Sequence, residues 1–225
     1  MSSVHRLRPS KCANEALGYS LDEAERSIII AAAASKLAEL FDTLNLDHRN
    51  DHNMRDTPRR VARMFVDEML RGRFAEPPVL TEFENVGKFD QLIVIGPIDV
   101  RSTCAHHLMP IYGEAFIGVL PAATGKIIGL SKYDRIVDYF CGRLQIQEEL
   151  VKQIGQFIMD NTSPLGVAVR ISAVHMCKTH RGVRAGHQSR MITSAYFGAL
   201  DQNQQRKDEF LRELVLLNGA SSRIS

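Results

Sequence analysis

Hydrophobic residues in the first third of the chain follow a helical spacing. One set recurs at i, i+3, i+4 and i+7, and consists of Leu37, Leu40, Phe41 and Leu44. A second set with helical spacing consists of Val61, Met64, Phe65 and Met69. Ser20 and Glu23 have the spacing of a capping box, and Thr57-Pro58 pairs a hydroxyl cap with a first-turn proline. The pattern therefore predicts two helices before the helix-breaking pair Pro77-Pro78.

Beyond this pair the pattern changes to short runs of Ile, Val and Phe bounded by Gly and Pro, as is typical of strands. These runs cover residues 91–100, 113–120, 166–177 and 191–200. Amphipathic stretches that predict helices cover residues 131–140, 145–159 and 206–217. Ser131 has the position of a hydroxyl N-cap for the first of these helices. Helices, two strands, two helices, two strands and a helix make an α+β fold.

The same pattern divides the chain into three parts. Residues 1–19 lack periodicity and predict a mobile arm, residues 20–78 a helical region, and residues 79–225 the domain that carries the chemistry. Alternation along residues 166–177 ends at His175 and Cys177, which a strand would direct to one face.

Composition narrows the class of protein. Hydrophobic residues at 44% and charged residues at 24% are ordinary for a globular chain. The formal net charge of +2 is too small to predict a nucleic-acid surface. No apolar run approaches the roughly 20 residues that a bilayer span needs. We therefore expect a cytoplasmic protein that binds neither nucleic acid nor membrane.

The four cysteines favour a metal or catalytic role, because a chain without a recognisable export signal keeps its thiols reduced. Cys104-Ala105-His106-His107 brings a thiolate and an imidazole into one short turn, and His175-Met176-Cys177 offers a second pair. Two thiolates with an imidazole suit zinc, and three protein ligands would leave a position open for water. A closed site that also uses His175 fits the spacing equally well. A histidine left unligated beside such a site can transfer protons near neutral pH.

Several blocks in this order resemble the signatures of the GTP cyclohydrolase I family, and together they are far more specific than any one motif. The blocks are residues 57–62, 102–107, 129–132, 135–137, 143–148 and 175–182. The resemblance extends from about residue 20 to the end of the chain. It implies a tunnelling fold, with a four-stranded antiparallel sheet and helices on one face. It also implies a ring-shaped homodecamer with active sites between subunits.

The resemblance implies a chemistry as well. Zinc would be held by Cys104, His107 and Cys177, with His106 and His175 as proton-transfer groups. The reaction would convert GTP and water to 7,8-dihydroneopterin triphosphate and formate, the entry step to folate or biopterin. A zinc-bound water with a pKa lowered toward ~7 is a suitable nucleophile for the poorly electrophilic purine C8.

The resemblance also implies which residues bind the substrate. Gln147 and Glu148 would bind the guanine, and Ser131 would contact the ribose. Three basic residues would hold the triphosphate through charge and hydrogen bonds, namely Lys132, Arg135 and Arg181. Without the resemblance, an adjacent Gln and Glu or a row of basic residues is typical of a solvated helix face.

One departure leaves alternatives open. Ala105 stands where the family usually has an acid between the cysteine and the histidine pair. A paralogue acting on another purine nucleotide or on a pterin would also fit the pattern. A third interpretation, from a different class, is a non-catalytic oligomer that zinc stabilises.

Overall fold

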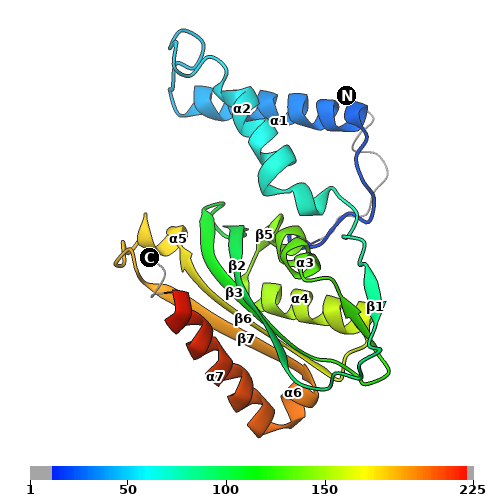
Figure 1. The fold of residues 1–225 in the computed structure, drawn as a ribbon. Helices are drawn as coiled ribbons and strands as arrows, with labels where there is room; N and C mark the ends of the chain where they lie inside the picture. Colours follow the sequence, from blue (N-terminus) through cyan, green and yellow to red (C-terminus); the bar gives the residue numbers. More distant parts are fainter. Residues whose placement is uncertain (1–11, 222–225) are drawn as a thin grey trace. The chain divides into compact units, whose positions relative to one another are not determined.

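The computed structural model describes residues 12–221, with side chains as far as Leu217, and these residues form two compact units that separate between Glu76 and Pro77 (Figure 1). The separation lies close to the boundary that the Pro77-Pro78 pair predicts. Of the predicted arm, residues 1–11 lie outside the described residues. Cys12 and Glu15, in the described part of this arm, are hydrogen-bonded to Arg73. The Arg73 guanidinium donates to their carbonyls at 2.7 and 2.9 Å.

The N-terminal unit is helical, as the sequence predicts. Helix α1 (Glu23–Thr43) packs against α2 (Thr57–Arg63), which continues as a π-helix (Met64–Met69) and a 3-10 turn (Arg71–Arg73). The expected capping box at Ser20 is wrong, because the box is formed by Asp22 and Glu25. The Asp22 carboxylate accepts from the Glu25 N–H at 2.8 Å, and the Glu25 carboxylate accepts from the Asp22 N–H at 3.2 Å. Asp22 has the extended backbone that an N-cap requires.

The C-terminal unit is built on a sheet with strand order β5-β2-β3-β6-β7. Its four long strands are antiparallel, namely β2 (Ile93–Cys104), β3 (Pro110–Leu120), β6 (Gly166–His175) and β7 (Arg190–Gly198). The two-residue β5 (Leu144–Gln145) pairs in parallel with the end of β2, so the sheet has five strands instead of the expected four. A separate pair joins β1 (Glu82–Glu84) to β4 (Lys126–Ile128). The α+β class is confirmed.

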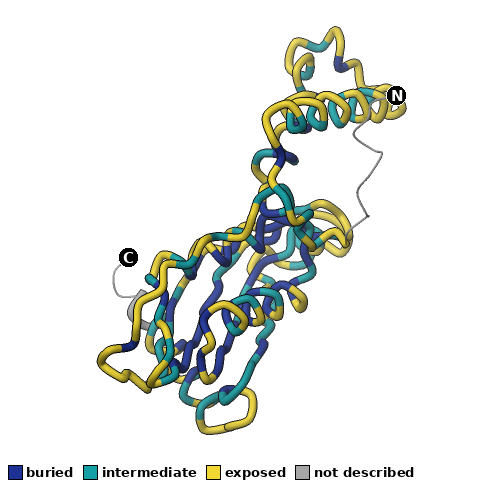
Figure 2. Tube along the Cα trace, turned by 90° about the vertical axis from the view of Figure 1, so that its right-hand side faces the viewer, coloured by how far each residue is buried: buried dark blue, intermediate teal, exposed yellow. Residues whose placement is uncertain are grey.

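Helices lie on both faces of this sheet. Helices α3 (Ser131–Cys141) and α4 (Gln147–Thr162) cover the larger core, and Figure 2 shows how burial concentrates in the strands. After α6 (Ala199–Gln202), α7 (Gln204–Ser221) packs Phe210 and Leu214 against Phe116 and Ala168. These two strand residues alternate with residues of the larger core, so α7 covers the opposite face. The expectation of helices on one face only is therefore wrong.

Two local predictions also differ from the structure. Ser131 is the first helical residue of α3, where Leu130 holds the N-cap position without a side-chain cap. Strand β6 ends at His175, and a short helix, α5 (Met176–Thr179), follows directly. Both differences arise at element ends, where a one-residue shift changes which side chain meets the free N–H groups.

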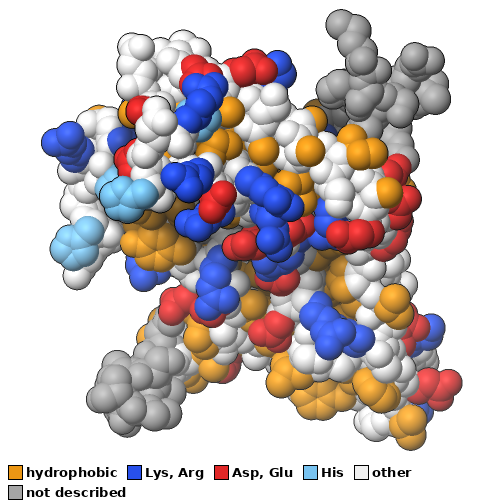
Figure 3. Space-filling model, turned by 90° about the horizontal axis from the view of Figure 1, so that it is seen from above, with side chains coloured by type: hydrophobic (Ala, Val, Ile, Leu, Met, Phe, Trp, Pro, Cys, Tyr) orange, Lys and Arg blue, Asp and Glu red, His pale blue; other side chains and the backbone are white. Residues whose placement is uncertain are grey.

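The surface carries charges of both signs. Figure 3 shows Lys and Arg side chains lying among Asp and Glu side chains. Among residues 12–221, no helix combines the length and the apolarity that crossing a membrane requires.

Candidate metal centre

The loop between β2 and β3 is a tight turn with a fixed backbone. The Cys104 N–H donates to the Met109 carbonyl at 2.8 Å, and the Leu108 N–H donates to the Cys104 carbonyl at 2.9 Å. The Ala105 N–H donates to the carbonyl of Gln145 in β5 at 3.0 Å. Cys104 is buried, while His106 and His107 are exposed. The two-residue β5 therefore anchors a turn that presents one thiol and two imidazoles.

The second pair of candidate ligands reaches this turn through the strand register. Ile111, near the start of β3, pairs with His175 at the end of β6, so α5 begins beside the β2–β3 turn. Cys177 is the second residue of α5. The expectation that strand alternation directs His175 and Cys177 to one face is wrong, because the chain turns into a helix after His175.

Three ligand atoms, from Cys104, His107 and Cys177, lie within 4.8 Å of one another. Burial raises the pKa of the Cys177 thiol, and the neighbouring Cys104 raises it further. Two adjacent thiolates are therefore unfavourable unless a cation lies between them. Two sulfurs and one imidazole nitrogen are a donor set that suits zinc. The residues present therefore fit a bound zinc ion.

His175 lies outside this group of three, although it precedes Cys177 by two residues. Its Nε2 lies 2.7 Å from Oε1 of Gln147. Burial lowers the pKa of His175, while the charge of Glu148 raises it and that of Lys178 lowers it. A neutral imidazole is thus favoured at neutral pH. On the exposed side, the rings of His106 and His107 meet edge to face with centroids 6.3 Å apart.

The structure relates the remaining predicted residues to the metal group in different ways. Glu148 is exposed and Arg181 is close enough for its charge to lower the pKa of Cys177. Ser131, Lys132 and Arg135 lie in the first turns of α3. Within residues 12–221, none of these three makes a hydrogen bond or ion pair with the metal group, and Lys132 Nζ donates to the Val79 carbonyl at 2.9 Å.

Two residues near the site were not singled out from the sequence. Gln145 supplies the carbonyl that holds the metal turn, and Thr193 Oγ1 accepts from the Gln147 amide at 3.0 Å. Gln145 alternates with Gln147 in the run that opens α4, but only the tertiary register reveals its contact. Thr193 in β7 carries no sequence signal for its role.

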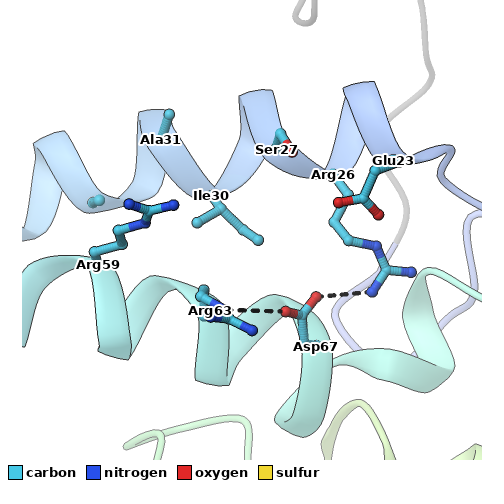
Figure 4. Close-up of a pocket in the computed structure, with 9 residues that line it drawn as sticks. Glu23, Arg26, Ser27, Ile30, Ala31, Arg59, Arg63 and Asp67 are labelled. Carbon is cyan, nitrogen blue, oxygen red and sulfur yellow. Dashed lines mark hydrogen bonds and ion pairs between the residues drawn. The ribbon is translucent and has the colours of Figure 1, made fainter.

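A groove of about 530 Å³ lies between α1 and α2 in the N-terminal unit (Figure 4). Asp67 accepts from Arg26 at 2.8 Å and lies 3.7 Å from Arg63, so these charges are paired within the groove. None of the predicted catalytic, substrate-binding or metal-binding residues lines it. The groove is therefore separate from the candidate metal centre.

Comparison with known proteins identifies relatives along most of the chain. The family model described as GTP cyclohydrolase I matches residues 33–215. A GTP cyclohydrolase 1 from Erwinia tasmaniensis is 37% identical over 86% of this chain and 84% of its own length. A GTP cyclohydrolase 1 from Salmonella choleraesuis is 36% identical over 93% of each chain.

Among solved structures, the archaeosine synthase QueF-Like in its apo form covers 55% of this chain and 98% of its own, at 14% identity and a TM-score of 0.36. That likeness is too low to assign a fold. The sequence matches extend through the β2–β3 turn, α3, α4 and α5. The chain therefore belongs to the GTP cyclohydrolase I family.

Proposed function

We propose that this chain binds zinc and hydrolyses GTP, opening the purine ring to give 7,8-dihydroneopterin triphosphate and formate. The observation that carries the proposal is the approach of Cys104, His107 and Cys177 ligand atoms to within 4.8 Å. Family membership supports the reaction. Bound there, zinc would supply Lewis acidity and lower the pKa of a water molecule toward neutrality. A three-residue ligand set is typical of catalytic sites.

His106 and His175 are the proposed proton-transfer groups. Ring opening, loss of formate and rearrangement of the ribose each move protons between substrate atoms, and imidazole does this efficiently near neutral pH. His106 is exposed beside His107. His175 is half-buried, and burial favours its neutral form, which is the form that accepts a proton.

The substrate contacts divide between two parts of the C-terminal unit. Glu148 is the proposed partner of the guanine N–H donors, because it is exposed, whereas Gln147 is 1% exposed and already hydrogen-bonded. Lys132, Arg135 and Arg181 are the proposed triphosphate contacts, since Arg forks and Lys ammonium groups bind phosphate oxygens. The exposed Ser131 hydroxyl is the proposed ribose contact.

We further propose a homo-oligomer, a decamer, whose active sites lie between subunits. Helix α3 has 11 residues, so its first turn lies about 15 Å from its end. That end lies beside the metal turn, because the Cys141 carbonyl accepts from Ser102 Oγ at 2.8 Å. A neighbouring subunit's α3 is therefore the proposed source of the phosphate contacts.

The sheet edges support this assembly. Within residues 12–221, β5 pairs only with Thr103 and Cys104, so the rest of the outer edge of β2 has no strand partner. Strand β7 forms the other edge and pairs only with β6. Long open edges are templates for pairing with another chain.

The activity test uses the zinc-loaded chain with GTP, measuring formate release and pterin fluorescence. We expect both products in the parent chain and neither in Cys177→Ser, which should also lose bound zinc. The control is Cys12→Ser, because Cys12 is an exposed thiol outside the metal group. It should retain zinc and full turnover. Absence of product from the parent chain with zinc fully bound would refute the proposed reaction.

Two further measurements separate the alternatives. A panel of purine nucleotides and pterins distinguishes GTP hydrolysis from the activity of a paralogue with another substrate. Cobalt substitution distinguishes a catalytic from a structural site, because its spectrum reports an exchangeable solvent ligand only in the former. A spectrum with four protein ligands would favour the non-catalytic oligomer.

Sites between subunits are tested by mixing two inactive variants. We expect Cys177→Ser and Arg135→Ala each to lack activity alone. Refolded together, they should regain part of the activity if one chain supplies the metal group and another supplies Arg135. Mixed assemblies that remain inactive would show that each site is built from one chain.

A further inference from the structure

Gln147 connects α4 to two strands through every polar atom of its side chain. Its Nε2, which carries two hydrogens, lies within hydrogen-bond distance of three acceptors: the carbonyls of Ile171 and Met191, both at 3.1 Å, and Thr193 Oγ1 at 3.0 Å. Its Oε1 lies 2.7 Å from Nε2 of His175. With 1% of its surface exposed, Gln147 lies beneath His175 and not at the surface where a substrate would arrive.

The orientation of this amide follows from its partners. Backbone carbonyls only accept hydrogen bonds, so the NH₂ group must face Ile171 and Met191. The reverse orientation would put the amide oxygen against two carbonyl oxygens and leave a buried polar group unsatisfied, which is strongly unfavourable. The amide oxygen therefore faces His175. Because an amide oxygen only accepts, the facing Nε2 of His175 must carry a hydrogen.

We propose that Gln147 is a positioning residue that holds the His175 ring in one orientation and in the Nε2–H tautomer, so that Nδ1 is the nitrogen of the neutral ring without a bonded hydrogen. The inference rests on the proposed function, in which His175 transfers protons. Within residues 12–221, Nδ1 makes no hydrogen bond. The lone pair of the neutral ring therefore lies at Nδ1, and the hydrogen bond from Nε2 to Gln147 fixes the orientation of the ring.

The contacts on β6 and β7 explain why the amide keeps this orientation through a catalytic cycle. Ile171 belongs to β6, and Met191 and Thr193 belong to β7. Ala173 pairs with Met191 and Ile171 pairs with Thr193, so the two strands present their acceptors side by side. Substrate binding would leave these backbone acceptors in place. Hydrogen-bonded partners of this kind fix the tautomer of a functional histidine.

The first test measures the tautomer directly in the full-length, zinc-loaded chain. With ¹⁵N-labelled histidine and the His175→Phe variant to assign the signals, we expect His175 to show a protonated Nε2 and an unprotonated Nδ1 in its neutral form. In Gln147→Leu the preference should be lost. A protonated Nδ1 in the parent chain, or an equal mixture of both tautomers, would overturn the inference. This readout needs no turnover, so it decides the inference even if GTP is not the substrate.

The second test separates positioning from substrate contact. We expect Gln147→Leu to lower kcat for GTP about 10- to 100-fold while KM stays within about twofold, since the ground-state contacts to substrate remain. The matched variant Gln156→Leu makes the same substitution at an exposed position of α4, where the amide donates to Asp160, so the His175 tautomer and kcat should match the parent. A large rise in KM with unchanged kcat in Gln147→Leu would show instead that Gln147 binds the substrate.

Discussion

The two units of the chain differ in how they bury hydrophobic residues. In the C-terminal unit, β6 directs Val167, Val169 and Ile171 into the larger core and Ala168 toward α7, each fully buried. In the N-terminal unit, α1 extends over 21 residues without one that is buried. Burial of apolar surface is the main source of stability. The C-terminal unit therefore has a core of its own, whereas packing within the described chain contributes little to the stability of α1.

This difference bears on where a precise site can be built. The metal turn follows β2, α5 follows β6, and Gln147 opens α4, so each candidate residue is attached to an element of the well-packed unit. Sites attached to rigid elements hold their geometry more closely than sites on loosely packed ones. The comparison therefore predicts large effects of substitutions in the C-terminal unit and small, local effects in the N-terminal unit.

The largest effect is expected from Phe210→Ala. Phe210 is fully buried, and its ring fills the space over Gly118, where an added Cβ would lie 2.7 Å from the ring. Truncation leaves a cavity and should lower the free energy of unfolding by about 3–5 kcal/mol. Urea denaturation followed by tyrosine fluorescence measures this, because four of the five tyrosines belong to the C-terminal unit.

The control for Phe210→Ala is Val215→Ala on the same helix, where the valine is 70% exposed. We expect Val215→Ala to change stability by less than about 0.5 kcal/mol. Equal losses in the two variants would mean that α7 does not pack on the sheet through Phe210.

A smaller loss of folding stability is expected at alkaline pH. Burial raises the pKa of Tyr133 to about 12. The unfolded chain releases the phenol proton near pH 10, whereas the folded chain retains it, so this stability is complete below pH 10 and is lost as the pH rises toward 12. Two pKa units correspond to about 2–3 kcal/mol. Urea midpoints from pH 8 to 11.5 should fall more steeply for the parent chain than for Tyr133→Phe, and parallel curves would contradict the prediction.

The sequence predicts most long elements of both units, because their spacing is a local property. The helices and strands around residues 131–141, 147–162 and 166–175 lie where periodicity predicts them. Short elements are different: β1, β4 and β5 have two or three residues each, too few to show a period. Helical spacing also does not show whether another part of the protein covers a given face of α1. Leu40 and Leu44 have helical spacing yet remain 48% and 58% exposed.

The candidate site shows the same limit. Cys104 and His107 share one turn, so their proximity follows from spacing alone. Cys177 joins them only through the pairing of Ile111 with His175, which no local pattern encodes. Gln147 is polar and opens a helix, which is typical of an exposed residue. Its burial depends on acceptors from two strands that lie 24 and 44 residues further along the chain.

In the N-terminal unit, Asp22→Ala tests a local contribution of about 1 kcal/mol. Asp22 caps α1, so its loss should free the Glu25 N–H and fray the first turn. Hydrogen exchange of the amides in that turn should accelerate, while β6 amides stay unchanged. Ser20→Ala is the matched control, because Ser20 lies just before the cap and is exposed. Equal acceleration in both variants would show that Asp22 does not act as the cap.

The smallest effect is expected from Leu40→Ala in α1. Because Leu40 is 48% exposed, its truncation should change the stability of a single chain by less than about 0.5 kcal/mol, with a better helix former offsetting lost contacts. Hydrogen exchange of α1 at a protein concentration low enough to give monomers measures this. A loss of 2 kcal/mol or more that appears only at higher concentration would mean that another copy covers Leu40. The difference in burial between the two units would then be a property of the single chain and would disappear in the assembly.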